Sequence, residues 1–187
     1  MDKLVLDIET SNTFADVGGE KNIGDLKVSL IGVYSYNQNK YFSFDENHIA
    51  EFEPLLKKTG LVIGFAINRF DIPVLNKHYN FDLFNLPRLD LLEEIELVRG
   101  HRVSLNSLAK SNLGLEKTHH SLEAITLYKD GNWEELKNYC LNDVKLTKDL
   151  YELAKNRGYL LLSDRDTGEL VKTELNFKEI ELPATLF

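Results

Sequence analysis

An apolar strand near the N-terminus carries two carboxylates on one of its faces. Side chains alternate across a strand, so Asp7 and Glu9 point to the same side, whereas Leu4, Leu6 and Ile8 point to the other. Two neighbouring carboxylates repel each other, so they need a cation or one of them must stay protonated. The alternative is a strand that frays into solvent at this point. The pair alone leaves a metal site and an exposed strand end equally open.

The composition favours one folded domain. The 187 residues suit a domain of ordinary size, and a hydrophobic content of 43% supports a proper core. No apolar run approaches the ~20 residues that cross a bilayer, and the first residues lack the pattern of a signal peptide. The single cysteine, Cys140, cannot form an internal disulfide, which agrees with a reducing compartment. We therefore expect a cytoplasmic protein that does not enter the membrane.

The charge balance is acidic, with 22 basic residues against 30 acidic ones and a net charge of −8. A large duplex-binding surface needs many Lys and Arg, so this balance argues against one. It does not exclude a nuclease, because clustered carboxylates bind divalent cations, and these supply the positive charge that meets a phosphate.

The order of the predicted elements indicates a mixed α/β domain with helices packed on a central sheet. Strands are predicted at 3–8, 28–36, 40–44 and 61–65, and helices at 48–58, 73–78, 104–113, 120–128 and 133–156. A further hairpin is predicted around residues 166–168. We expect residues 1–158 to form the main domain and residues 159–187 to be a hairpin and tail that packs on it.

The helix 133–156 is the clearest element, and it has one apolar stripe. Asp143 borders this stripe, where a carboxylate is costly unless it is paired or metal-bound. Tyr139 lies on the same face, one turn earlier; the alternative is a core-edge tyrosine beside a partly exposed aspartate. Gly158 is predicted to end the helix in the left-handed conformation. The stripe consists of Trp133, Leu136, Cys140, Val144, Thr147, Leu150, Tyr151 and Ala154.

A further carboxylate, Asp71, falls between the apolar strand 61–65 and a helix with Pro73 in its first turn. An aspartate at such a junction can cap the helix, which is the simpler interpretation of this residue by itself.

Together the three segments resemble the DEDD superfamily of 3′→5′ exonucleases. The first strand supplies Asp-x-Glu, the strand-to-helix junction supplies Asp71, and the Tyr-x-x-x-Asp of the late helix is typical of the DEDDy branch. The segments GFAINRFDIPVL, SLNSLAKSNLGLEK and YCLNDV are similar to YprB-like ribonuclease-H-like domains and to the proofreading domains of family B DNA polymerases. The resemblance runs from about residue 3 to residue 155. Relatives carry asparagine where this chain has Ala66, which removes a loop-holding or substrate-positioning hydrogen bond but leaves the carboxylates intact.

The resemblance implies a ribonuclease-H-like sheet and two-metal hydrolysis that releases nucleoside 5′-monophosphates from the 3′ end of single-stranded DNA or RNA. Two divalent cations, Mg²⁺ or Mn²⁺, would lie roughly 3.5–4 Å apart. By motif, Asp7 would bridge both metals, and Glu9 and Asp143 would complete the nucleophile-side metal. Asp71 would hold the second metal through water, and Tyr139 would orient the attacking water.

Two other functions stay open: a ribonuclease-H-like endonuclease, and an inactive nucleic-acid-binding module that kept the fold. The Tyr-x-x-x-Asp helix argues against the first, because in relatives it accompanies 3′-end chemistry. The second usually loses a carboxylate, and all four are present here.

Contacts to nucleic acid are predicted on weaker grounds. A locally basic stretch contains Arg99 and Arg102, for which a solvated surface is an equal alternative. The apolar segment 182–187 loosely resembles peptides that dock on sliding clamps, so a replication or repair partner is a second hypothesis, against packing on its own domain. The remaining candidate contacts lie beside the motifs, at Thr10, Phe65, Asn68 and Phe70.

Overall fold

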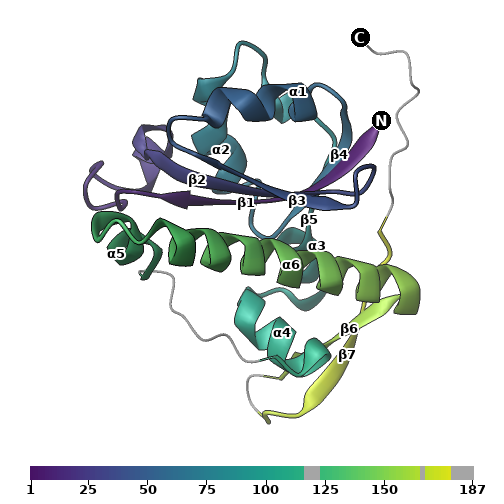
Figure 1. Ribbon diagram of the computed structural model, residues 1–187. Coiled ribbons are helices and arrows are strands. Elements are labelled where there is room, and N and C mark those ends of the chain that lie inside the picture. Colours follow the sequence, from purple (N-terminus) through teal and green to yellow (C-terminus); the bar gives the residue numbers. More distant parts are fainter. Residues whose placement is uncertain (116–122, 165–166, 178–187) are drawn as a thin grey trace.

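A five-stranded mixed sheet forms the centre of the computed structural model, which describes residues 1–115, 123–164 and 167–177 (Figure 1). The strand order is β3-β2-β1-β4-β5. Strand β2 is antiparallel to β1 and β3, whereas β4 is parallel to β1 and β5. The strands are β1 (Asp2–Thr10), β2 (Val28–Ser35), β3 (Lys40–Asp45), β4 (Thr59–Gly64) and β5 (Arg88–Asp90).

Helices cover both faces of this sheet. Figure 1 shows α1 and α2 on one face and the long α6 on the other, with α4 and a small β6–β7 hairpin beyond α6. These helices are α1 (Glu53–Leu56), α2 (Asp71–Leu75), α3 (Leu91–Arg99), α4 (Leu105–Leu113), α5 (Glu123–Lys129) and α6 (Trp133–Arg157). The hairpin is β6 (Tyr159–Ser163) and β7 (Leu170–Glu174), and short 3-10 helices occupy Glu20–Asp25, Ile49–Phe52, Asn76–His78 and Leu83–Asn85. The predicted α/β class is therefore confirmed.

The alternation predicted for the first strand divides the core into two layers. Leu4, Leu6 and Ile8 lie in one apolar cluster with residues of α2. Val5 lies in the other cluster, with residues of α6 such as Val144. Asp7 and Glu9 follow the parity of Val5, so they point toward α6.

Helix α6 forms as its apolar stripe predicts and ends at Gly158, whose φ is 75°. Seven of the eight predicted stripe residues are buried. Trp133 is the exception, with 42% of its surface exposed. It is the first residue of the helix, and its ring contacts Tyr128 of α5 edge-on, with 5.3 Å between the ring centroids. Position in the helical repeat therefore did not predict burial at the first residue of the helix.

Two parts of the element prediction were wrong. The helix predicted at 48–58 is a 3-10 turn followed by the one-turn α1, because Pro54 lacks an N–H and its ring clashes with the carbonyl four residues earlier. The segment 88–99, for which no element was predicted, forms β5 and α3. A strand of three residues is too short to show alternation.

The β6–β7 hairpin packs against α4 and α6. The side chain of Asn112 in α4 accepts the N–H of Leu161 at 2.8 Å and donates to its carbonyl at 2.7 Å. Leu160 and Leu162 join the apolar cluster of α6. The division into domains stays a prediction, and the tail at 178–187 lies outside the described residues. Among the helices of the described ranges, none has the length and apolar character that a membrane span requires.

Strand β2 and helix α6 approach closely at Gly32. A Cβ placed on Gly32 would lie 2.6 Å from the Sγ atom of Cys140 and 3.1 Å from Cγ2 of Val144. Gly32 is paired with Asp7 in the β1–β2 register, so this contact sets how near α6 comes to β1, the strand that carries Asp7 and Glu9.

We predict that Gly32→Ala lowers the free energy of unfolding by about 1–3 kcal/mol, since the added methyl group overpacks the contact. The loss should shrink in a Cys140→Ala background, which removes the nearest atom. Gly24→Ala is the control, because a Cβ there meets open space. Denaturant unfolding of these variants measures the effect. An equal loss in both cysteine backgrounds would show that the contact is not limiting.

Candidate active site

The end of β1 that faces α6 holds the first two predicted site residues. Asp7 is paired with Gly32, and Glu9 with Leu30. The Sγ atom of Cys140 lies 3.6 Å from Oδ2 of Asp7 and 3.6 Å from its carbonyl oxygen. One carboxylate oxygen of Asp7, one of Glu9 and this sulfur lie within 4.8 Å of one another. The strand therefore presents a compact set of potential metal ligands.

Asp71 reaches β1 from the other side of the strand end. Strand β4 pairs with β1 only at Asp2–Val5, so the edge of β1 beyond Val5 has no β4 partner. Oδ1 of Asp71 accepts the N–H of Ile8 there, at 2.9 Å. Asp71 is the first residue of α2, and the N-cap position belongs to Phe70. The interpretation of Asp71 as a helix cap is therefore wrong, because its carboxylate accepts a hydrogen bond from the backbone of β1.

Helix α6 supplies the remaining two predicted residues. Asp143 and Tyr139 are both buried. Tyr139 packs in a small cluster with Leu30, the partner of Glu9, and with Leu136. Asp143 follows one turn later and its charge acts on Asp7. The structure thus brings the other three carboxylates close to Asp7, and Tyr139 lies one turn before Asp143 on α6.

The cluster carries more negative charge than its surroundings favour. Burial raises the pKa of Asp7 well above its ordinary value, and three neighbouring carboxylates raise it further. These neighbours are Glu9, Asp71 and Asp143. Burial likewise raises the pKa of Asp71 to about 7. Burial, together with the charges of Asp7, Glu9 and Asp143, raises the pKa of the Cys140 thiol, which keeps it neutral. A bound cation or a bound proton has to compensate this charge.

The donor set fits a hard divalent cation. Carboxylate oxygens from Asp7 and Glu9 are the ligands that Mg²⁺ and Mn²⁺ prefer. The thiol of Cys140 in the same group would also suit a softer metal. The close approach of these atoms and the raised pKa of Asp7 are both what a cation would relieve.

A buried carboxylate that sequence reasoning missed, Asp90, fixes the loop that carries Asp71. Its Oδ1 accepts the N–H of Ala66 at 2.8 Å and its Oδ2 accepts that of Asn68 at 3.0 Å. It also caps α3 by accepting the N–H of Leu92 at 3.0 Å. Asp90 and Glu93 have the spacing of a capping box, which is the signal that could have predicted both this helix and this residue.

The predicted nucleic-acid contacts are dispersed. Phe70 packs edge-on against Phe14, with centroids 6.0 Å apart, whereas Phe65 joins the apolar cluster on the α6 face. The Asn68 side chain donates to Glu93 and accepts from Arg88, both at 2.7 Å.

The other three predicted contacts have partners within the protein. Thr10 is buried and donates to the carbonyl of Asn12. Arg99 lies 3.6 Å from Asp164, and Arg102 lies 3.2 Å from Glu96. These contacts do not test substrate binding, so all six residues stay predictions.

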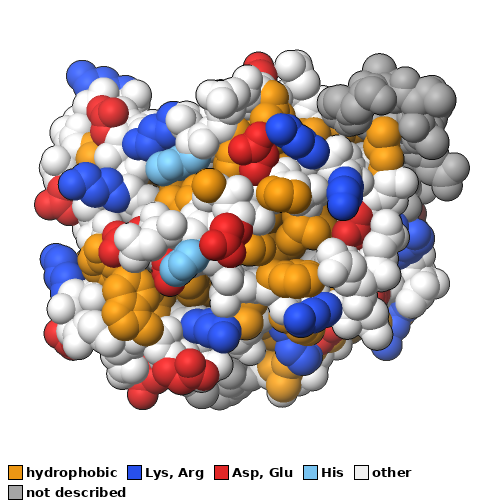
Figure 2. Space-filling view, turned by 45° about the horizontal axis from the view of Figure 1, so that its top comes forward, with side chains coloured by type: hydrophobic (Ala, Val, Ile, Leu, Met, Phe, Trp, Pro, Cys, Tyr) orange, Lys and Arg blue, Asp and Glu red, His pale blue; other side chains and the backbone are white. Residues whose placement is uncertain are grey.

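The face of the molecule shown in Figure 2 has no continuous basic surface. Lys and Arg side chains alternate there with Asp, Glu and apolar side chains. This agrees with the net charge of −8, which argues against binding duplex through a broad electropositive face.

The sheet and its carboxylates define a ribonuclease-H-like α/β domain. The chain belongs to the RNase H superfamily, whose family model matches residues 4–155. No curated protein matches the sequence significantly. The fold is similar to part of the family B DNA polymerase from the hyperthermophilic archaeon Pyrobaculum calidifontis, with a TM-score of 0.62 and 18% identity. The match covers 83% of this chain but only 24% of the polymerase.

We predict that Asp71→Asn stabilises the metal-free protein more at pH 8 than at pH 5. The pKa of Asp71 is about 7 in the fold and 3.8 ordinarily, so its contribution to folding is present at low pH and is lost as the pH rises between these values. The gain should reach the order of a few kcal/mol at pH 8. The amide oxygen can still accept from Ile8.

Thermal unfolding in chelator, with Asp130→Asn as an exposed control, measures this difference. Added Mn²⁺ should stabilise the wild type at pH 8 more than the Asp71→Asn variant. A stability gain that does not depend on pH would contradict the prediction.

We also predict that Ala66→Asn raises the free energy of unfolding by about 0.5–1 kcal/mol. Ala66 has φ 65°, where an alanine side chain is strained and an asparagine is tolerated. Ala66 already lines an open groove, so the longer side chain has room. Ala15→Asn, at an exposed position without a positive φ, is the control. Lower stability of Ala66→Asn in denaturant unfolding would contradict this account.

Proposed function

We propose that this protein is a metal-dependent 3′→5′ exonuclease that removes nucleoside 5′-monophosphates from single-stranded nucleic acid. The observation that carries the proposal is the delivery of carboxylates to one strand end by three separate elements. Asp7 and Glu9 come from β1, Asp71 from α2 and Asp143 from α6. Burial and the repulsion between these like charges raise the pKa of Asp7, and a cluster of this kind is typical of a functional site.

Each residue has a distinct part in the proposed reaction. Two bound divalent cations would supply the charge compensation and Lewis acidity that activate a water and stabilise the leaving 3′ oxygen. Asp7, which has carboxylates on both sides of it, would bind both cations. Glu9 and Asp143 would hold the nucleophile side, and Asp71 the leaving-group side. Tyr139, one turn before Asp143, would orient the attacking water through its hydroxyl group.

The comparisons support this choice within the superfamily. Membership in the RNase H superfamily agrees with phosphodiester hydrolysis, and the fold is shared with a region of a DNA polymerase. Tyr139 is the residue that favours cleavage at the 3′ end over internal cleavage, because the resemblance to DEDDy exonucleases depends on it. We assign the reaction to residues 1–158 and regard residues 159–187 as an addition packed on that domain.

The test uses 5′-labelled single-stranded DNA and RNA of one sequence, incubated with Mg²⁺, Mn²⁺ or chelator. We predict a metal-dependent ladder that shortens from the 3′ end. Asp7→Ala should lower the rate by at least about 100-fold, because even changes in groups that merely support metal ligands cost 10- to 100-fold. The exposed carboxylate variant Asp130→Ala is the matched control and should keep the wild-type rate.

Two results would reject the proposal. Initial products cut at internal positions would identify an endonuclease. Absence of cleavage, or cleavage that persists in Asp7→Ala, would move the assignment to a binding module.

A further inference from the structure

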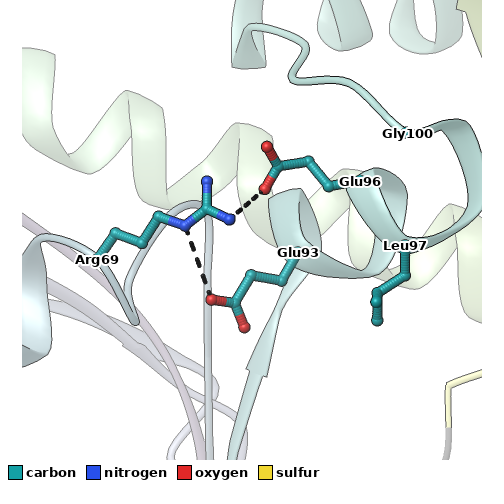
Figure 3. Close-up of a pocket in the computed structure, with 5 residues that line it drawn as sticks. All are labelled: Arg69, Glu93, Glu96, Leu97 and Gly100. Atoms are coloured by element: carbon teal, nitrogen blue, oxygen red, sulfur yellow. Dashed lines mark ion pairs between the residues drawn. The ribbon is translucent and has the colours of Figure 1, made fainter.

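The loop that leads to Asp71 carries an arginine that forms ion pairs with helix α3. Arg69 is in the loop between β4 and α2, two residues before Asp71. Its guanidinium points toward α3, as Figure 3 shows, with 2.6 Å from Nη2 to Glu96 and 3.9 Å from Nε to Glu93. A pocket of about 350 Å³ opens on this side, next to Leu97 and Gly100. Two acids of α3 therefore hold Arg69, which lies two residues before Asp71 in the sequence.

Glu96 holds a second arginine as well. Its Oε1 lies 3.2 Å from Nε of Arg102. The two arginine side chains stay 41% and 65% exposed, whereas that of Glu96 is only 19% exposed. One largely covered carboxylate thus lies between two accessible guanidinium groups.

Both arginines also line a groove together with Phe70, the residue that precedes Asp71. The groove has a volume of about 430 Å³, within the ~300–1,000 Å³ typical of small-molecule sites. Phe14 follows β1, Phe70 follows β4 and Leu92 follows β5. These three strands are parallel, so the groove lies at the edge where they all end. The lining of the groove also includes one acid, Glu20.

The lining combines the two chemistries that bind single-stranded nucleic acid. Aromatic rings such as Phe14 and Phe70 stack on bases, and guanidinium groups bind phosphates. A guanidinium is needed here more than in a basic protein, because the net charge of −8 and the carboxylate cluster repel phosphate.

Resting on the proposed function, we propose that Arg69, with Arg102, binds a backbone phosphate of the single-stranded substrate in this groove, and that Glu96 competes with that phosphate for both guanidinium groups. Substrate binding exchanges the Glu96 ion pairs for phosphate contacts. Glu96 therefore weakens substrate affinity, which lets the enzyme release and advance along the strand.

The experiment measures binding of fluorescent single-stranded DNA and RNA by anisotropy in an Asp7→Ala background, across a series of salt concentrations. Glu96→Gln should tighten binding about threefold or more, because the arginines lose their competing charge. Arg69→Ala should weaken binding about five- to tenfold and reduce the salt slope by about 0.7, the value for one phosphate contact on a single strand. The DNA and RNA arms show whether the phosphate contact depends on the sugar.

Matched variants separate local from general charge effects. Arg157→Ala in the last turn of α6 and Glu51→Gln in the 3-10 helix Ile49–Phe52 remove exposed charges elsewhere and should leave affinity unchanged. The gain from Glu96→Gln should shrink in the Arg69→Ala background if the two residues act through one contact. Thermal unfolding checks that every variant is folded.

Weaker or unchanged binding by Glu96→Gln would overturn the proposal. An Arg69→Ala effect no larger than that of Arg157→Ala would also overturn it. The binding assay needs no cleavage, so it is independent of the exonuclease test. A protein that binds as predicted but cuts neither strand would refute the exonuclease and leave this phosphate site established.

Discussion

Helix α6 can approach β1 only because Gly32, the partner of Asp7, leaves no side chain between them. The contact sets Cys140 against Asp7 and carries Asp143 to the same strand end one turn later. A larger residue on β2 would move the whole helix, since interiors are too closely packed to absorb a methyl group locally. The site therefore depends on the close approach of the β2 backbone to α6 as well as on its polar contacts.

That proximity has an electrostatic cost. Asp71 and Asp90 are both buried carboxylates at the ends of parallel strands, yet their surroundings differ. Burial raises the pKa of Asp90, and the N–H groups that it accepts from the loop after β4 and from the first turn of α3 oppose this rise. Asp71 accepts the N–H of Ile8 and faces Asp7 at the same strand end. The first arrangement stabilises a loop; the second makes proton binding and cation binding alternative ways to stabilise the fold.

Much of this arrangement could be predicted from the sequence, because it depends on periodicity. The alternation in β1 and the stripe of α6 assigned Asp7, Tyr139 and Asp143 to faces that the structure confirms. What could not be predicted depends on contacts between distant segments. The bond from Asp71 to Ile8 joins residues 63 positions apart and leaves no periodic trace. The role of Asp90 could be predicted only from its capping-box spacing to Glu93, because the strand that it ends is three residues long.

The parallel arrangement of β1, β4 and β5 explains why opposite charges meet at one edge. Loops that follow parallel strands converge, so Arg69 and Asp71, which follow β4, come to the edge where β1 carries Asp7 and Glu9. The carboxylates repel a phosphodiester, and Glu96 shields the arginines that would attract one. Under the proposed function, the metal-free protein would therefore have little net attraction for nucleic acid. Affinity would rise when cations neutralise the carboxylates, which couples substrate binding to the metal state that the proposed chemistry requires.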